Sequence, residues 1–445
     1  FLTACIFTEI YVAMMTTTAS IAESVTVSIG QEECSASPCD SPLITYVESD
    51  TADSVVLSST DQKPDHQSTE EDTSSTRRKS NTIQTLHCNK SPPLRSTGTD
   101  SNCASPNDTE TKTLSSKGYQ RDHFICNTLQ GQVFTARRIN PQNGTVQNVV
   151  IKTANIALHQ QGITMLKGHK RKVQENIFGE YLTLKKFTEC NAPSSCIKFY
   201  DFFMDREHFY LVMERGGQSL FEFVVEAHRW IKSGHLSIDD WQKHVCCMFV
   251  EMVEFIRWMH EKQFCCNLDI SLENIVLSEN VRIRRDEQSG RIVIDNLHIK
   301  FIDFGLIQQF KQNETEFVSQ KFVGKAGYKA PQIYYAQKFH ANKADIWSLG
   351  VCLFMMLVGA PPFVSADWND VGFRLICNGD MKRLLLSWKR CQYVTADLYD
   401  LIQAILRNDE SKRIDLEAIL NHKALRMFLV KDCNEEIGGD ECAEM

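Results

Sequence analysis

The chain has 445 residues, of which 42% are hydrophobic, and its formal net charge is -8. This length leaves room for two or three average domains, or for one large domain with flexible sequence. The acidic balance argues against a general nucleic-acid binder, because such proteins are usually basic. The 17 cysteines stand singly or as adjacent pairs in apolar stretches. We therefore expect reduced thiols in a cytoplasmic protein, with a nuclear location left open, rather than disulfides or a zinc site.

The first part of the chain, residues 1–117, is rich in Ser, Thr and acidic residues and lacks apolar periodicity after its opening segment. The apolar opening, residues 1–14, has no basic leader and is too short for a membrane span. Because the sequence does not begin with Met, we expect it to be a fragment or an over-extended gene model. Sequence this polar cannot bury enough surface to offset its ordering entropy, so 1–117 is predicted to be disordered. Its Ser-Pro pairs are candidate regulatory phosphorylation sites.

From residue 118 the composition becomes that of a globular domain. Apolar runs bounded by turn residues predict strands at Val133–Ala136, Asn148–Thr153, Phe199–Phe203 and Phe209–Glu214. Helical periodicity predicts a helix over Lys172–Thr188.

Beyond residue 214, helical patterns dominate. The predicted helices are Ile238–His260, Ala344–Leu357, Asp397–Leu406 and Leu416–Leu420. The apolar run from Ile346 to Phe363 includes most of the second of these helices. It is predicted to be a buried helix rather than a membrane span, because it contains Ser348 and ends in Pro361-Pro362. The fold class is therefore α+β: a small β-rich lobe at 118–214 and a larger helical lobe at 215–428, with a cleft between them. Residues 429–445 form an acidic tail.

Three short motifs follow one another within this domain. They are Asn267-Leu268-Asp269-Ile270-Ser271-Leu272-Glu273-Asn274, then Asp303-Phe304-Gly305, then Tyr328-Lys329-Ala330-Pro331. Each alone is a weak signal, but the set in this order resembles the catalytic loop, magnesium loop and activation-segment anchor of the eukaryotic protein kinase family. The resemblance covers residue 119 to about residue 428 and implies a bilobal kinase fold.

The resemblance implies roles for several residues. Asp269 matches the carboxylate that accepts the proton of the substrate hydroxyl, and Asn274 and Asp303 match the Mg²⁺ ligands. Oxygen ligands of this kind suit Mg²⁺. Lys152, in Val149-Val150-Ile151-Lys152, matches the lysine that holds the ATP phosphates. Its partner is expected to be Glu180; Glu175 is the rival, but leaves the following apolar residues out of register.

The remaining expected contacts are with the nucleotide. Together with Lys152, the set comprises Gly131, Val133, Val150, Met213, Glu214 and Val276. Asp345 matches the residue that supports the catalytic loop from a helix of the larger lobe, and Arg413 matches the arginine that pairs with the acid of the A-P-E motif. Gln332 stands at that acid and is expected to hydrogen-bond Arg413 without charge assistance.

The sequence also departs from the family pattern. In the loop that reads H-R-D-L-K-P-E-N in the family, Asn267, Leu268, Ser271 and Leu272 replace His, Arg, Lys and Pro. Ser271 cannot supply the charge near the γ-phosphate that Lys would, and Leu268 cannot bind an activation-segment phosphate. In the phosphate-covering loop, Cys126 and Thr128 replace the first two glycines. Val150 replaces a small Ala, and Lys325 replaces Thr.

Two hypotheses of different class follow. One is an active kinase with a weakened phosphate-binding loop, using ATP and Mg²⁺ to phosphorylate protein substrates; the other is a pseudokinase that serves as a binding scaffold. The enzyme is favoured because all five principal polar groups of the family are present: Lys152, Glu180, Asp269, Asn274 and Asp303. Tyr328-Lys329-Ala330-Pro331 follows the Ser/Thr kinase pattern. Neither a nucleic acid nor a membrane is expected as a partner, and the oligomeric state is left open.

Overall fold

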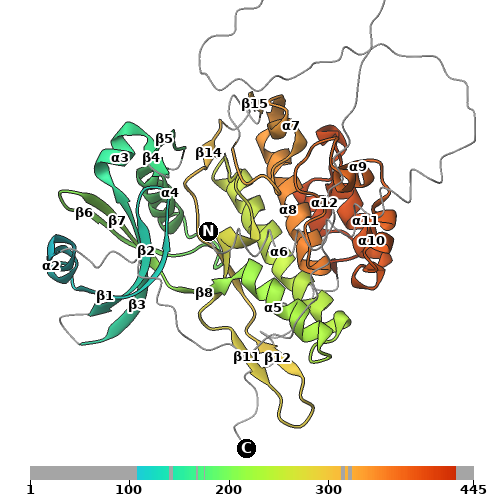
Figure 1. The fold of residues 1–445 in the computed structure, drawn as a ribbon, viewed down its shortest axis with the longest axis horizontal. Helices are drawn as coiled ribbons and strands as arrows, with labels where there is room; N and C mark the ends of the chain where they lie inside the picture. The colour runs from blue at the N-terminus through green and yellow to red at the C-terminus, as the bar shows by residue number, and fades with distance from the viewer. Residues whose placement is uncertain are drawn as a thin grey trace, which may run out of the picture. The chain divides into compact units, whose positions relative to one another are not determined.

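The computed structural model describes residues 108–139, 144–166, 169–174, 176–311, 316–318 and 323–426. These residues form a lobe built on an antiparallel sheet and a second, mainly helical lobe (Figure 1). The expected disorder of 1–107 and the acidic tail at 429–445 lie outside the described residues.

The sheet of the first lobe has five strands in the order β1-β2-β3-β7-β6. Their bounds are Tyr119–Asn127 (β1), Gln132–Ile139 (β2), Val146–Asn155 (β3), Phe199–Met204 (β6) and His208–Glu214 (β7). Neighbouring strands in this order are antiparallel, and Val133 pairs with Lys152 while Val150 pairs with Met213. The four strands predicted from apolar runs are confirmed; β1 was not predicted, because its residues are mostly polar and exposed.

One helix of this lobe begins later than predicted. The helix α4 spans Ile177–Glu189, whereas Lys172 belongs to the strand β5 (His169–Lys172), which pairs with β4 (Ile163–Leu166). Asn176 sets the start, because its side chain accepts a hydrogen bond from the N–H of Gly179. The short helix α3 (Ile156–Gln161) precedes this hairpin and was not predicted either.

The folded part also starts earlier than the boundary at residue 118. Asp108–Ser116 forms the helix α2, which packs against β1. Its Leu114 is 2% exposed and belongs to the core formed with Phe134, Val149 and Ile151. Composition hid this helix, because a single apolar residue in a run of Thr, Ser and charged residues anchors it.

The second lobe is built around two long helices, α6 (Ile238–Lys262) and α8 (Ala341–Val358). The other helices are α5 (Leu220–Lys232), α7 (Pro331–Tyr334), α9 (Val371–Cys377), α10 (Met381–Ser387), α11 (Ala396–Ile405) and α12 (Leu416–Leu420). Among the described helices, α8 alone is long and apolar enough to cross a membrane, but 89% of it is buried within the protein. It is therefore the core helix of the lobe, as its sequence predicted.

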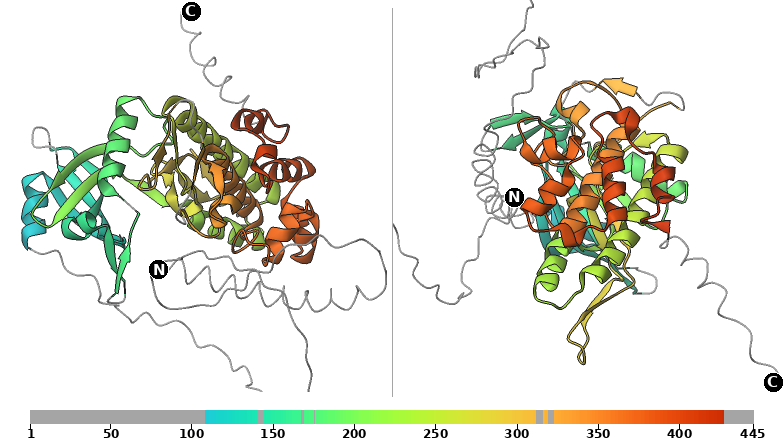
Figure 2. Two further views of the ribbon diagram at one scale, coloured as in Figure 1. Left: turned by 90° about the horizontal axis from the view of Figure 1, so that it is seen from above. Right: turned by 90° about the vertical axis from the view of Figure 1, so that its right-hand side faces the viewer.

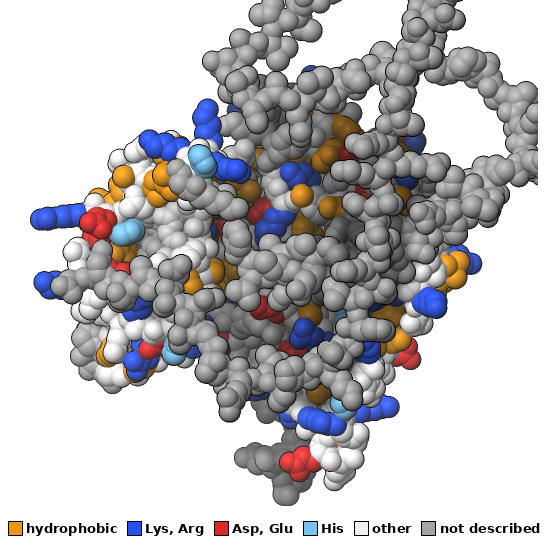
Figure 3. Space-filling view, viewed as in Figure 1, with side chains coloured by type: hydrophobic (Ala, Val, Ile, Leu, Met, Phe, Trp, Pro, Cys, Tyr) orange, Lys and Arg blue, Asp and Glu red, His pale blue; other side chains and the backbone are white. Residues whose placement is uncertain are grey.

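Short strands lie in the segments that connect these helices. They are β8 (Gly216–Ser219), β9 (Cys265–Cys266), β10 (Ile275–Ser278), β13 (Ile299–Phe301), β14 (Gln308–Gln309), β15 (Glu316–Val318) and β16 (Lys338–His340). The hairpin of β11 (Arg282–Arg285) and β12 (Ile292–Asp295) projects from the lobe in both Figure 1 and Figure 2. On the face drawn in Figure 3, Lys and Arg side chains are spread over several elements, and hydrophobic side chains show only in small groups.

Leu114→Ala should lower the free energy of unfolding by about 2–3 kcal/mol, because it leaves a cavity under the sheet. Urea unfolding of the full chain measures this change. Leu386→Ala is the matched control: Leu386 is 58% exposed, and its loss should cost less than about 0.5 kcal/mol. Equal effects of the two substitutions would contradict the role of α2 in the core.

Candidate functional site

A buried ion pair links the sheet to α4. The Lys152 Nζ lies 2.8 Å from the Glu180 Oε2, and the Glu180 side chain is 1% exposed. The Lys152 ammonium also lies 3.6 Å from Asp303 in the second lobe. The expected pairing with Glu180 is thus present in the structure; the rival, Glu175, lies outside the described residues. This geometry brings a cation and a carboxylate from the two lobes together.

Asp303 follows β13 and is held in an ionised form. Burial alone would raise the pKa of Asp303, but the Lys152 ammonium, the Gly305 N–H and the charge of Lys325 together hold its pKa below the ordinary value. The Gly305 N–H donates to Asp303 Oδ1 at 3.0 Å. An ionised carboxylate here is the form that a divalent cation requires.

Residues 267–274, here called the catalytic loop after the family segment that they resemble, bring Asp269 and Asn274 into contact. Asn274 Nδ2 donates to Asp269 Oδ2 at 2.8 Å and to the Asp269 carbonyl at 3.0 Å. These bonds turn the amide oxygen of Asn274 away from Asp269. Asn267, which replaces the family's His, accepts a hydrogen bond from the Asp269 N–H at 3.0 Å. The substitution therefore provides a side-chain hydrogen bond to the main chain of Asp269.

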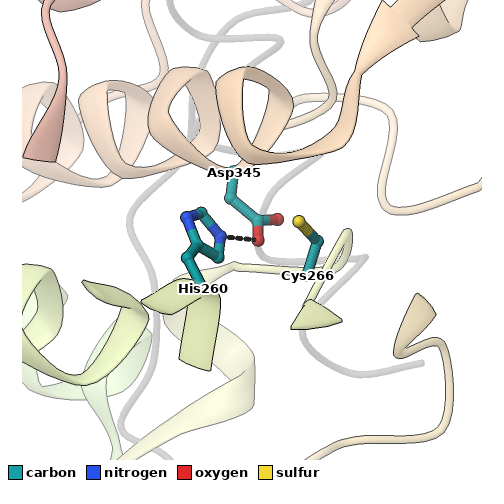
Figure 4. Close-up of side chains that lie close together, drawn as sticks. All are labelled: His260, Cys266 and Asp345. Carbon is teal, nitrogen blue, oxygen red and sulfur yellow. Dashed lines mark hydrogen bonds and ion pairs between the residues drawn. The ribbon is translucent and has the colours of Figure 1, made fainter. Parts of the chain in front are cut away.

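Asp345 on α8 supports the catalytic loop through its carboxylate. Its carboxylate is fully buried and accepts the N–H groups of Asn267 and Leu268, each at 2.8 Å. His260, from the end of α6, contacts the same carboxylate through Nε2 at 2.8 Å (Figure 4). The end of α6 and the loop that follows it are thus joined to α8 at one carboxylate, in the role expected of Asp345.

The side chains in Figure 4 also include Cys266, and His260, Cys266 and Asp345 offer donor atoms within 4.8 Å of one another. A metal would need the thiolate of Cys266, but burial and the neighbouring Asp345 carboxylate raise the pKa of that thiol. Both Asp345 oxygens already accept backbone N–H groups. We therefore interpret the cluster as a support of the catalytic loop.

The turn between β1 and β2, residues 128–131, is closed by its own hydrogen bonds. Thr128 Oγ1 accepts the Gly131 N–H at 2.9 Å, and the Thr128 N–H donates to the Gly131 carbonyl at 2.9 Å. Gly131 cannot be replaced, because a Cβ there would lie 2.2 Å from the Thr153 carbonyl oxygen. The expected glycine is thus required by the approach of β3.

Sequence reasoning missed a second anchor of this turn. The Gln130 side chain is buried, and its Nε2 donates to the carbonyls of Ile163, at 2.8 Å, and Leu158, at 3.2 Å. These acceptors lie at the start of β4 and in α3, so the turn is fixed to the segment that follows β3. No local motif could have indicated these hydrogen bonds, because they join residues 28 and 33 positions apart.

The other residues expected around the nucleotide lie on the neighbouring strands β2, β3 and β7 and on β10. Val150 pairs with Met213, and both lie on the strands that carry Lys152 and Glu214. The Glu214 carboxylate is held by Lys300 Nζ at 3.0 Å and by the Lys198 N–H at 3.1 Å. Val133 pairs with Lys152 on the adjacent strand, and Val276, from β10 of the second lobe, is buried.

Phe304 connects the two lobes through aromatic contacts. Its ring lies edge-on to Phe187 of α4, with centroids 5.5 Å apart, and to Phe255 of α6, with centroids 6.1 Å apart. Phe304 is 2% exposed. The packed position of Phe304 places the neighbouring Asp303 next to Lys152.

The segment after residue 322 returns to the catalytic loop. Lys325, expected only as a replacement for Thr, has its Nζ 2.7 Å from Ser271 Oγ and 2.7 Å from Asn274 Oδ1. Sequence reasoning missed this contact. The signal was available: one motif lacks a lysine at residue 271, and another gains one at residue 325.

Gln332 and Arg413 are paired as predicted. Arg413 Nη2 donates to Gln332 Oε1 at 2.6 Å, and burial lowers the pKa of Arg413 to about 10. The guanidinium remains charged at neutral pH and is also held by the carbonyls of Arg407 and Lys343. Thr315 and Ser319, the hydroxyl residues of the activation segment that could carry a phosphate, lie outside the described residues.

Comparison with known proteins gives a consistent result. The family described as the protein kinase domain matches residues 137–425. Among curated relatives, serine/threonine-protein kinase CHK1 of Saccharomyces cerevisiae is 25% identical over 53% of this chain and 40% of its own length. SNF-related serine/threonine-protein kinase of Homo sapiens is 26% identical over 69% of this chain and 32% of its own length. Calcium-dependent protein kinase 2 of Oryza sativa subsp. japonica is 31% identical over 49% of this chain and 36% of its own length. The matched part of this chain thus spans less than half the length of these relatives.

Lys152→Met should destabilise the protein by about 2 kcal/mol or more, because it leaves the Glu180 carboxylate buried without its ammonium partner. Glu180→Gln alone and the double variant complete a double-mutant cycle in urea unfolding. We expect the loss of unfolding free energy in the double variant to be smaller than the sum of the two single losses by more than about 1 kcal/mol. Additive effects would show that the two side chains do not stabilise each other.

Proposed function

Because the chain belongs to the eukaryotic protein kinase family, we propose that it transfers the γ-phosphate of ATP to Ser or Thr residues of protein substrates. The observation that carries this proposal is the alignment of Lys152 with both Glu180, at 2.8 Å, and Asp303, at 3.6 Å. A phosphoryl transfer depends on positioned charge more than on covalent chemistry by the protein. The aligned groups supply that charge across the two lobes.

Each group then has a stated task. Lys152 binds the α- and β-phosphates, and Glu180 holds its ammonium in place. Asp269 orients the substrate hydroxyl and accepts its proton as the oxygen attacks the γ-phosphorus. The Asp303 carboxylate and the Asn274 amide oxygen are the hard donors that would hold Mg²⁺. Asn274 Oδ1 already accepts from Lys325 Nζ at 2.7 Å, and its second lone pair would bind the metal. When bound, Mg²⁺ neutralises charge on the phosphate oxygens.

The proposed acceptor class rests on the segment 328–331. Tyr328-Lys329-Ala330-Pro331 follows the Ser/Thr kinase pattern, and two of the relatives above are named as serine/threonine-protein kinases. The partners are accordingly protein substrates and a nucleotide. We place the protein in the cytoplasm or nucleus, a proposal supported by the cysteines of the described residues, which are free thiols.

A second function, a pseudokinase scaffold, is favoured by one observation. The Gly131 N–H is already donated to Thr128 Oγ1 at 2.9 Å. A backbone N–H used in this way is not free to bind a phosphate oxygen. This hydrogen bond therefore weakens the binding of phosphate by the turn and favours the scaffold. The alignment of Lys152 with Asp303 favours the enzyme.

Asp269→Asn should reduce phosphoryl transfer by at least about a hundredfold, because the amide cannot accept the proton of the substrate hydroxyl. Radiolabelled ATP turnover by the full chain, followed by phosphoamino-acid analysis of the product, measures both rate and acceptor class. Asp397→Asn is the control, because Asp397 is 50% exposed on α11. Phosphotyrosine as the product would refute the acceptor class, and a wild-type rate equal to that of Asp269→Asn would favour the scaffold.

Activity should not require phosphorylation of the activation segment. In the family, the arginine before the catalytic Asp binds that phosphate, but the Leu268 side chain is buried there and has no donor. Thr315→Ala and Ser319→Ala should therefore retain most of the wild-type kcat/KM. A loss greater than about tenfold would show that another cation binds the phosphate. Leu268→Arg is the complementary variant, designed to introduce phosphate dependence.

A further inference from the structure

Lys325 approaches the catalytic loop with its charge only partly neutralised. Its two short contacts, each 2.7 Å, are with the neutral oxygens of Ser271 and Asn274. Its ion pair with Glu273 is longer, at 3.9 Å. An ammonium held mainly by neutral oxygens retains its attraction for an anion. The Lys325 side chain is 37% exposed, so an anion can reach it.

The backbone fixes where this lysine sits. Gly324 has a φ of +79°, and a Cβ there would lie 2.5 Å from the Leu268 carbonyl oxygen. Only glycine allows this approach. The Lys325 N–H then donates to Asp269 Oδ1 at 3.1 Å. The main chain of residue 325 is therefore bonded to the proposed base, while its side chain reaches the proposed metal ligand.

We propose that Lys325 supplies the cation that the catalytic loop lacks at Ser271 and that its ammonium binds the γ-phosphate of ATP. The inference rests on the proposed function. Relative to the family pattern, a lysine and a hydroxyl residue have exchanged positions: the loop has Ser271 for Lys, and residue 325 is Lys for Thr. The side chains of both positions meet in space, so the exchange keeps an ammonium and a hydroxyl at the same place.

The reaction that Lys325 assists is balanced as follows. The oxygen of a substrate hydroxyl forms a bond to the γ-phosphorus, and the bond from that phosphorus to the β–γ bridging oxygen breaks. The electron pair of the broken bond stays on ADP, and the hydroxyl proton passes to Asp269. The Lys325 ammonium keeps its protons and stabilises the negative charge on the transferred group.

A purely structural role is the competing explanation. Asp269, Glu273 and Asp303 all lie near Lys325, and the charge of Lys325 helps to lower the pKa of Asp303. A structural counter-ion would stabilise the loop whichever nucleotide is bound. A ligand of the γ-phosphate would instead distinguish ATP from ADP, and this difference can be measured without turnover.

The test compares binding of MgATP and MgADP to the full chain by calorimetry. Lys325→Ala should weaken MgATP binding by about tenfold and leave MgADP binding unchanged, since one charged contact is lost only with ATP. The double variant Ser271→Lys with Lys325→Thr should restore the preference for MgATP. Lys338→Ala, an exposed lysine on β16, is the matched control and should change neither affinity.

Three outcomes would overturn the inference. They are equal weakening of MgATP and MgADP, a fall in melting temperature with no change in either affinity, and no binding of MgATP by the wild-type chain. Turnover separates this inference from the proposed function. If the wild type binds MgATP through Lys325 but does not transfer phosphate, the proposed function fails and the assignment of Lys325 stands. If the wild type is active, Lys325→Ala should lower kcat by about a hundredfold and the double variant should recover it.

Discussion

The buried carboxylate of Asp345 fixes the position of the catalytic loop. It accepts the N–H groups of two consecutive residues, Asn267 and Leu268, and contacts His260 from α6. A carboxylate that is fully buried is costly unless its oxygens are satisfied, and charge-assisted bonds to N–H groups are among the strong ones. Since α8 is buried along nearly its whole length, the core of the second lobe determines where Asp345 lies. The geometry of Asp269 thus depends on how α8 packs in the core of the second lobe.

The charges around the loop show what the fold constrains and what it leaves open. Phosphoryl transfer requires positive charge at a point in space, and the residue that supplies it can come from more than one segment. Lys325 reaches Ser271 from the segment that follows the activation loop. The approach of Gly324 to Leu268 brings the two segments close enough for a side chain on either one to serve. A motif lysine missing from one loop is therefore weak evidence of lost activity until the neighbouring segment is placed.

The features that local sequence predicted are those with a local cause. Alternating or continuous apolar runs predicted β3 and β7. The pairing of Lys152 with Glu180 is not local, and it was predicted only from the resemblance to the kinase family. The start of α4 was missed because the Asn176 cap outweighs a periodicity that extends to Lys172. Leu114 was missed because a single apolar side chain gives no periodicity.

The contacts of Gln130 and Lys325 could not be read from sequence for a different reason. Gln130 bonds to carbonyls 28 and 33 residues away, and Lys325 meets Ser271 across 54 residues. Such contacts depend on how separate segments fold back on one another, which neither composition nor periodicity encodes. The compensating exchange of Ser271 and Lys325 is the exception, because two departures from one family pattern are both visible in the sequence and can be compared there.

Leu268 shows that the backbone and the side chain of the catalytic loop have separable roles. Its φ is +60°, a conformation that costs a residue with a Cβ roughly 1 kcal/mol or more. The bond from its N–H to Asp345 and the close approach of Gly324 to its carbonyl both act on the main chain, so they hold this conformation whatever the side chain is. The side chain can then change from the family's Arg to a buried Leu without moving Asp269. Control by a phosphate on the activation segment depends on that side chain, whereas alignment of the proposed base depends on the backbone alone. A kinase of this fold can therefore lose the first and keep the second.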